Sequence, residues 1–314
     1  MGRGVDGLPI RVGTRGSALA RAQTDGVLRA LRAAHPDVPF EPTLITTAGD
    51  RSQPTNLPGP DWGSGVFVRE IETALTRGAI DLGVHSLKDM PPRLPHHLVL
   101  AAVLPREDPR DVLVSAAGWT FDQLPTGALV GTASVRRSAF LRAARPDLRF
   151  APIRGNVDTR CRKMLAGEYD AIVLARAGLR RLGLAVPQTA IDPRLLLPAP
   201  GQGAVALQAR ADDAAMRRLA QPLHDLTTGA AVTAERRLME EMDGGCRLPV
   251  AALATPLSGG QLELTAAVAA PDGGRVVWAT LVGALDQPED LALRVAARLR
   301  AAGADQLTPV AATS

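Results

Sequence analysis

The sequence predicts an α/β protein in which two similar α/β blocks are followed by a smaller α+β domain. Three observations lead to this fold class. Short apolar runs alternate with helical patterns in the first part of the chain, the same alternation recurs after residue 105, and the C-terminal part reads as a helix, a hairpin and a final helix. The chain has 314 residues, which at about 100 to 200 residues per domain allows two or three domains.

The first block has the order strand, helix, strand, helix, strand. A strand is expected over 10–13, and Ser17 is a candidate N-cap for a helix that Pro36 ends. The elements that follow are a strand over 44–47, a helix from Phe67 that Gly78 closes, and a strand over 80–85. Repeated units of this kind favour parallel strand pairs, with ligands at the carboxyl ends of the strands.

The second block starts near Pro105 and repeats this pattern. Its strands are expected over 111–115, 128–131, 149–153 and 171–175, and its helices over 134–144 and 157–166. A further strand over 204–209 follows Pro200. The third domain is expected to contain a helix over 228–242, strands over 261–269 and 275–282 joined by the turn 271–274, and an amphipathic helix over 290–302.

The composition excludes several classes of function. Cys161 and Cys246 are too few for a disulfide framework or a Cys-rich zinc site, and the histidines lack ligand spacing, so we expect no metal. Aromatic residues make up 3% of the chain and the arginines are interspersed with acids, which argues against nucleic acid. Without an apolar run near the roughly 20 residues of a membrane helix, or an apolar segment after the first arginines, we expect a cytoplasmic protein with no membrane partner.

Three strand-to-helix junctions carry Ser or Thr together with Arg. They are Val12–Ser17, Gly131–Arg137 and Arg154–Arg160. Guanidinium groups bind carboxylates through paired hydrogen bonds, so these junctions predict a cleft for a polyanionic ligand. The alternative is that the arginines are solvated at exposed first turns, but a cation there opposes the helix dipole and needs a further reason.

Two more segments carry candidate chemistry. Lys88 and Asp89 directly follow an apolar strand, and Lys88 is one of only two lysines among 36 basic residues. Cys246 follows Gly244 and Gly245 and precedes Arg247, a setting that favours a thiolate on a flexible turn. A surface Lys-Asp pair is the alternative for the first segment. Cys161 lies in a helical stretch and is interpreted as an incidental thiol.

The motifs together resemble the porphobilinogen deaminase (hydroxymethylbilane synthase) family from end to end. The resemblance is carried by Thr14–Ser17, Gly65–Glu70, His85–Asp89, Arg106–Asp111, Gly131–Arg137, Arg154–Arg160, Pro200–Ala204 and Gly244–Cys246. It implies a transferase of tetrapyrrole and heme biosynthesis that joins four porphobilinogens head to tail, releases ammonia at each condensation, and frees hydroxymethylbilane by hydrolysis. It also implies a dipyrromethane cofactor, tied through a thioether to Cys246.

The resemblance implies three domains. Residues 7–105 with 200–222 and residues 106–199 would form two similar α/β domains resembling periplasmic binding proteins, and residues 223–314 would form a smaller α+β domain that carries the cofactor cysteine. It further implies that the protein binds porphobilinogen and the growing polypyrrole chain. We expect the protein to be a monomer.

The residues matched to the family's site divide into three groups. Asp89 would be the catalytic carboxylate, which stabilises the cationic pyrroles formed when ammonia leaves and when the next bond forms, and relays protons. The cofactor would be held by Cys246, Lys88, Ser86, Thr132, Ser134, Arg136, Arg137 and Arg160. The substrate would be held by Arg15, Ser17, Gln23, Phe67, Arg154 and Arg181.

The sequence departs from the family pattern at two positions outside this centre. Ser64 stands in a loop where many relatives have lysine, and Asp158 replaces a glycine. A non-catalytic, two-lobed anion receptor or sensor would explain the Ser/Thr/Arg junctions equally well. It would not explain Lys88 and Asp89 or the Gly-Gly-Cys turn. A cysteine hydrolase is disfavoured because the motif around Cys246 contains no histidine.

Overall fold

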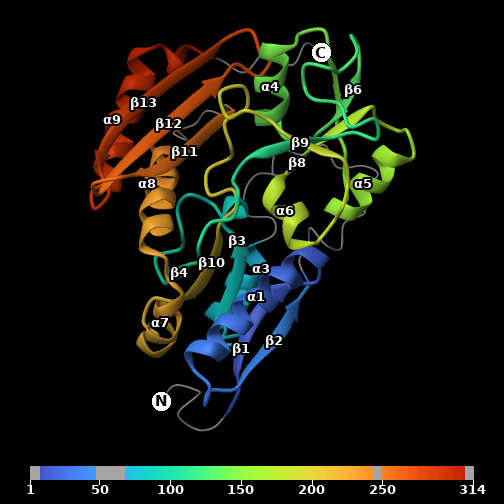
Figure 1. The fold of residues 1–314 in the computed structure, drawn as a ribbon. Helices are drawn as coiled ribbons and strands as arrows, with labels where there is room; N and C mark the ends of the chain where they lie inside the picture. Colours follow the sequence, from blue (N-terminus) through green and yellow to red (C-terminus); the bar gives the residue numbers. More distant parts are fainter. Residues whose placement is uncertain (1–7, 47–67, 243–248, 308–314) are drawn as a thin grey trace. The chain divides into compact units, whose positions relative to one another are not determined.

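The computed structural model describes residues 8–46, 68–242 and 249–307 (Figure 1). Contacts divide the chain into two compact units: residues 1–107 with 204–229, and residues 108–203 with 230–314. In the described ranges, no helix is both long enough and apolar enough to cross a membrane.

The first unit is built on a five-stranded sheet in the order β2-β1-β3-β10-β4. Its strands are β1 (Ile10–Arg15), β2 (Phe40–Ile45), β3 (Leu82–Ser86), β4 (Leu98–Val103) and β10 (Val205–Arg210). β1 pairs in parallel with β2 and β3, whereas β10 runs antiparallel to β3 and β4. The predicted parallel pairs are therefore present, and one central strand comes from a part of the chain far away in sequence and runs against them.

Helices cover both faces of this sheet. They are α1 (Ala18–Ala34), α3 (Arg69–Thr76) and α7 (Ala214–Ala220). Val27 and Leu31 of α1 pack with Val12, Val84 and the apolar side of α7 on one face. Ile71 and Leu75 of α3 pack with Ile80 on the other face. Successive side chains of a strand point to opposite faces, so a sheet that is covered on both faces needs apolar side chains on both of them.

The second unit contains a five-stranded sheet with the same plan, in the order β7-β6-β8-β5-β9. Its strands are β5 (Asp111–Val114), β6 (Leu129–Gly131), β7 (Arg149–Ala151), β8 (Ala171–Ala175) and β9 (Gln188–Ala190). β6 is parallel to β7 and β8, and β5 is antiparallel to β8 and β9. Position by position, the two sheets have the same strand directions, which confirms two similar α/β domains.

Helix α4 (Val135–Ala144) covers one face of this second sheet, and α5 (Val157–Leu165) and α6 (Arg176–Arg181) cover the other. The C-terminal part of the unit is an antiparallel sheet of β11 (Val250–Leu257), β12 (Gln261–Ala269) and β13 (Val276–Ala284). Helices α8 (Leu226–Met242) and α9 (Pro288–Ala301) pack on one face of it (Figure 1). Ala251, Ala267 and Ala269 on the opposite face pack against the α4 side of the neighbouring sheet.

Most expected elements are confirmed, with boundaries shifted by a few residues. Ser17 is the N-cap of α1, and its side chain accepts a hydrogen bond from the backbone N–H of Ala20. The turn after β12 is also present, with Gly273 at φ +81°, where glycine avoids the strain that a side chain would cause. The domain boundaries given for the three domains stay a prediction.

Five elements were not expected: β4, β9, β11, α6 and α7. β11 is rich in alanine and contains Pro256, both unusual in strands, but it lies at a sheet edge where proline is tolerated. The strand expected over 44–47 was placed too late, because β2 pairs with β1 from Phe40 onward. The C-terminal domain is therefore a three-stranded sheet with two helices, rather than a hairpin with two helices.

Candidate active site

In the first unit, the polar residues predicted for the site lie at the carboxyl ends of β1 and β3. Gln23 is buried in the second turn of α1, and its amide Nε2 lies 2.9 Å from the hydroxyl Oγ of Ser86. The same hydroxyl donates to Oε1 of Gln23 over 3.0 Å. The two side chains therefore fix each other, which explains why a polar residue is buried at this helical position. Arg15 is the last residue of β1, and Ser17 is the N-cap of α1.

Lys88 and Asp89 lie in a single 3-10 turn, Leu87–Asp89, directly after β3. The turn is anchored on both sides, since the side chains of Leu87 and Met90 are buried and the Leu87 N–H donates to the carbonyl of Ala204 over 3.1 Å. Lys88 and Asp89 themselves are half-buried. A rigid base with two partly exposed charged side chains suits groups that must meet a ligand in a fixed geometry.

His85 lies in the sheet immediately before this turn and is only 5% exposed. Burial lowers the pKa of His85 to about 4, the positive charge of Arg15 acts in the same direction, and the Gln208 side chain opposes the shift. The ring is therefore neutral at pH 7. A neutral ring adds no positive charge to that of Arg15 and Lys88 at this end of the sheet.

The buried ring predicts a specific loss of stability in acid. Between pH 6.5 and about 4, the unfolded state binds a proton at His85 that the folded state does not, so the free energy of unfolding falls as the pH is lowered. The full contribution is about 3 kcal/mol, reached near pH 4. We expect His85→Leu to lose less stability than the unaltered protein between pH 7 and pH 4.5, measured by urea unfolding at both values. An equal loss in the two proteins would contradict the assignment.

In the second unit, Arg136 and Arg137 form a buried group with Asp111, here named the twin-arginine cluster. Nη2 of Arg136 lies 2.7 Å from Oδ2 of Asp111, and Nη2 of Arg137 lies 2.7 Å from Oδ1. The Nη1 groups reach backbone carbonyls: Nη1 of Arg136 donates to the carbonyl of Leu197, and Nη1 of Arg137 donates to the carbonyl of Val173. Two cations in the first turn of α4 oppose the helix dipole, and their ion pairs with Asp111 explain why they are tolerated there.

In the part of the chain that the structure describes, the ion pairs of this cluster join two guanidinium groups to one carboxylate. Burial lowers the pKa of the Arg136 guanidinium, while the charge of Asp111 opposes that shift. The cluster therefore carries more positive than negative charge in a place where water screens it poorly. A ligand carboxylate would balance that charge.

The other predicted residues of the second unit lie at or near the ends of helices: Thr132 and Ser134 precede α4, Arg154 precedes α5, Arg160 is in the first turns of α5, and Arg181 ends α6. The Thr132 hydroxyl accepts from the Ser134 N–H over 3.2 Å, and the Ser134 hydroxyl accepts from the Arg137 N–H over 3.4 Å. Ser134 therefore caps α4 and Thr132 fixes the turn before it, while both remain candidate ligand contacts. Arg160 donates to the carbonyl of Gly155 and Arg181 to that of Gly203, while Arg154 is exposed.

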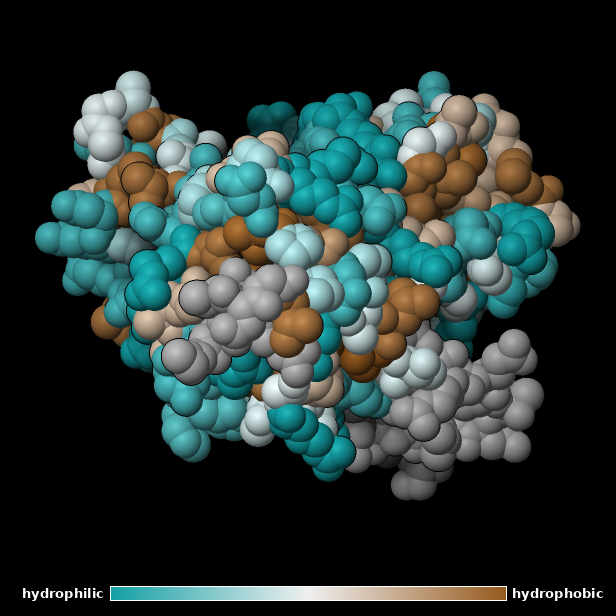
Figure 2. Space-filling model, turned by 90° about the horizontal axis from the view of Figure 1, so that it is seen from below, coloured by the Kyte–Doolittle hydropathy of each residue, from teal (hydrophilic) through white to brown (hydrophobic). Residues whose placement is uncertain are grey.

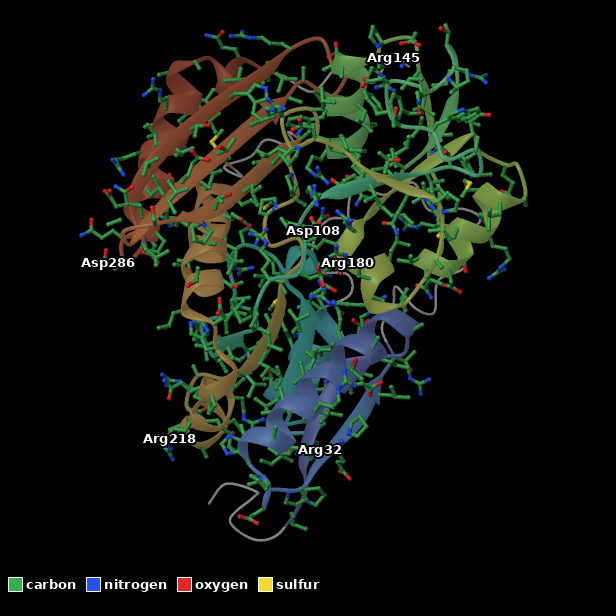
Figure 3. The ribbon with its side chains drawn as sticks, viewed as in Figure 1. Arg32, Asp108, Arg145, Arg180, Arg218 and Asp286 are labelled. Atoms are coloured by element: carbon green, nitrogen blue, oxygen red, sulfur yellow. The ribbon has the colours of Figure 1, made fainter. Side chains whose placement is uncertain are left out.

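A second ion-pair group lies just before β5. Asp108, labelled in Figure 3, pairs with Arg110 over 2.7 Å and with Arg176 over 2.9 Å. Hydrogen bonds from Arg110 lower the pKa of Asp108 to about 2, so this carboxylate stays charged at any physiological pH. The group fixes the segment that leads into Asp111.

Sequence reasoning missed Asp111, Gln202 and Glu235 as parts of the site. Asp111 and Gln202 lie in motifs that carry the resemblance, but they were given no role. Asp111 could have been recognised because it starts the apolar run Asp111–Val114. An acid in a buried strand is tolerated when it pairs with a basic side chain. Cys246 and Phe67 lie outside the described residues, so their predicted roles stay predictions.

The thiol that the structure does describe is shielded. Cys161 is 4% exposed among Val112, Met164 and Leu179. Burial raises the pKa of the Cys161 thiol, and Asp158 acts in the same direction. The group is thus a poor nucleophile.

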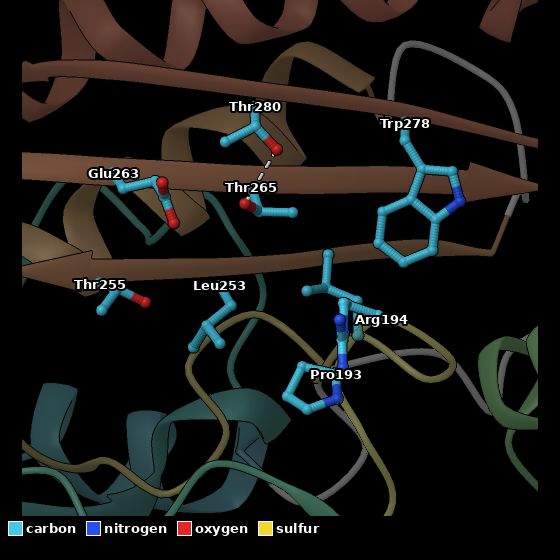
Figure 4. Close-up of a pocket in the computed structure, with 9 residues that line it drawn as sticks. Pro193, Arg194, Leu253, Thr255, Glu263, Thr265, Trp278 and Thr280 are labelled. Atoms are coloured by element: carbon cyan, nitrogen blue, oxygen red, sulfur yellow. Dashed lines mark hydrogen bonds between the residues drawn. The ribbon is translucent and has the colours of Figure 1, made fainter.

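A hollow of about 500 Å³ lies on the open face of the three-stranded sheet (Figure 4). Thr265 and Thr280 share a hydrogen bond on its floor, and Trp278 and Arg194 border it. Among the residues that the structure describes, no predicted site residue lines this hollow, although Leu197, which lines it, accepts a hydrogen bond from Nη1 of Arg136.

Two family models match the chain. "Porphobilinogen deaminase, dipyromethane cofactor binding domain" matches residues 10–218, and "Porphobilinogen deaminase, C-terminal domain" matches residues 230–301. A porphobilinogen deaminase of Roseiflexus castenholzii is 47% identical over 301 residues, covering 95% of this chain and 98% of the relative. The porphobilinogen deaminase of Acidothermus cellulolyticus is 47% identical and covers 95% of this chain and 90% of the relative. The chain belongs to the porphobilinogen deaminase family.

Proposed function

We propose that the protein joins four porphobilinogen molecules head to tail, releases ammonia at each condensation, and finally frees hydroxymethylbilane by hydrolysis. The observation that carries this proposal is the twin-arginine cluster, in which two buried guanidinium groups pair with a single carboxylate. Each pyrrole of the substrate brings an acetate and a propionate, so the growing chain supplies the carboxylates that such cations bind. Membership of the family supports the same reaction.

The proposed binding groups are present in both units. In the first unit, Arg15, Ser17 and Gln23 would bind substrate, and Ser86 and Lys88 would bind cofactor. In the second unit, Arg154 and Arg181 would bind substrate. Thr132, Ser134, Arg136, Arg137 and Arg160 would bind the cofactor, while Phe67 would contact the pyrrole rings. The bonds from Arg160 to the carbonyl of Gly155 and from Arg181 to the carbonyl of Gly203 hold both guanidinium groups in place.

The described residues fit a dipyrromethane group. Its carboxylates would balance the excess charge of the twin-arginine cluster, and we propose that a thioether from Cys246 attaches it. When bound, this group supplies the nucleophilic pyrrole carbon from which the product chain grows. Cysteine attachment requires a reduced thiol, which supports a cytoplasmic location.

Asp89 is the proposed catalytic carboxylate. Its anchored turn holds the carboxylate at the end of β3, close in sequence to Lys88. There its charge stabilises the positive charge that develops on a pyrrole as ammonia departs, and the group relays protons. Electrostatic stabilisation of this kind needs a carboxylate that is fixed before the charge forms, which the buried Leu87 and Met90 provide.

We also propose that the protein acts as a monomer. On the face shown in Figure 2, the described hydrophobic residues form patches separated by hydrophilic ones. Separate apolar patches are common on the surfaces of monomeric proteins, which is compatible with the proposal.

The function is tested by intact-mass measurement on the purified protein, followed by incubation with porphobilinogen. We expect a chain heavier than its sequence by a dipyrromethane unit, release of ammonia, and formation of hydroxymethylbilane. A bare chain that binds porphobilinogen and leaves it unchanged would instead support the receptor alternative.

A further inference from the structure

We infer that Glu235 is a positioning residue, which ties helix α8 to the twin-arginine cluster through the turn at Gly201 and Gln202. The inference rests on the proposed function, because it concerns how the proposed carboxylate site is held in shape. All the residues involved belong to the second unit.

Glu235 is a completely buried carboxylate on α8, with 0% of its surface exposed. One of its oxygens accepts from the backbone N–H of Gly201 over 2.6 Å, and the other accepts from the N–H of Ala254 on β11 over 2.8 Å. A buried carboxylate is costly unless it is well hydrogen-bonded, and here it joins a helix, a strand and a turn. Its position therefore determines where the turn lies relative to α8.

The turn can hardly move without disturbing Asp111. Gly201 and Gly203 have φ values of +72° and +89°, so the backbone takes a conformation that other residues avoid. Between them, Gln202 is 1% exposed and its Nε2 donates to the carbonyl of Pro109 over 2.7 Å and to Oδ1 of Asp111 over 3.0 Å. Gly201 carries the contact with Glu235, and the next residue carries the contact with Asp111.

Asp111 in turn orients both arginines. Its Oδ1 accepts from Nε and Nη2 of Arg137 as well as from Gln202, and its Oδ2 accepts from Nη2 of Arg136. A small displacement of Gln202 would alter the carboxylate that aligns both guanidinium planes. Hydrogen bonds, together with the peptide bond between Gly201 and Gln202, thus connect Glu235 to the proposed carboxylate-binding groups.

The decisive variant is Glu235→Gln, which keeps the shape of the side chain. One amide oxygen can still accept an N–H, but the amide nitrogen cannot, so one buried backbone N–H loses its acceptor. We expect a folded protein in which a smaller fraction of chains carries the dipyrromethane adduct by intact mass, and in which the KM for porphobilinogen rises roughly tenfold. In the loaded fraction, we expect kcat to change by less than about threefold, because the hydrogen bonds of Glu235 to Gly201 and Ala254 position backbone and not the proposed catalytic carboxylate.

Asp81→Asn is the matched control. Asp81 is another buried acid whose ion pair with Arg11 spans 3.0 Å, but it belongs to the first unit, and neither Arg11 nor its second ion-pair partner Arg210 is a proposed site residue. We expect Asp81→Asn to lower the melting temperature while adduct loading and KM remain those of the unaltered protein. Equal effects of the two substitutions on loading and KM at a similar loss of melting temperature would overturn the inference.

Gln202→Met tests the same path at its next step and decides the question if Glu235→Gln fails to fold. It removes the two donated hydrogen bonds at similar volume, so we expect lower loading and a higher KM again. In the double variant, the losses should not add, because both substitutions interrupt one path. Normal loading and KM in Gln202→Met would refute the inference, whereas an unaltered protein without adduct or product would refute the proposed function itself.

Discussion

The Cys246→Ser protein is expected to fold normally, to carry no covalent dipyrromethane, and to form negligible hydroxymethylbilane. A serine hydroxyl has no comparable nucleophilicity without a base to activate it, and the motif around this position contains no histidine. Intact mass, the colour reaction of pyrroles and product formation measure the three expected losses. Circular dichroism verifies that the fold is retained.

The second cysteine provides the control for this experiment. Cys161 is buried between α5 and the sheet, and its raised pKa leaves little thiolate at neutral pH. Cys161→Ser should therefore keep the adduct, the colour reaction and product formation, apart from a modest loss of stability caused by a hydroxyl in an apolar place. An adduct on Cys246→Ser, or its loss in Cys161→Ser, would place the attachment site on the other thiol.

Asp89→Asn is expected to lower kcat by on the order of 10² or more, because the amide keeps the size of the side chain and removes the charge that stabilises the pyrrole cations. The KM for porphobilinogen should change much less than kcat. Steady-state kinetics of the loaded variant test this expectation.

Asp158→Asn serves as the comparison for Asp89→Asn. Asp158 is an exposed acid in the first turn of α5, at 3.8 Å from Arg162, and exposed pairs of this kind contribute little. We expect its kcat to match that of the unaltered protein. A kcat for Asp89→Asn within a few-fold of the unaltered value, in a folded protein, would show that Asp89 is an ordinary surface acid.

The elements with clear local signals were predictable from the sequence. α1 has a capping serine and an apolar stripe, β8 is an uninterrupted apolar run, and the turn after β12 contains two glycines, so each was placed correctly. α7 had a usable signal that was overlooked, since Asp213 caps it by accepting from the Met216 N–H. β9 has only three residues, too short for any period to appear.

The sequence by itself determined the α/β class, the repeated block, the family motifs and the polar residues at strand ends, because each of these depends on neighbours within a few residues. Only the tertiary structure decided that β10 enters the first sheet between β3 and β4, and that Arg136 and Arg137 share Asp111 in a buried cluster. It likewise joined Gly201, Gln202 and Glu235 to that cluster. The physical reason is that pairing between distant strands and the cost of burying a charge depend on which segments meet in space, and no local pattern encodes that meeting.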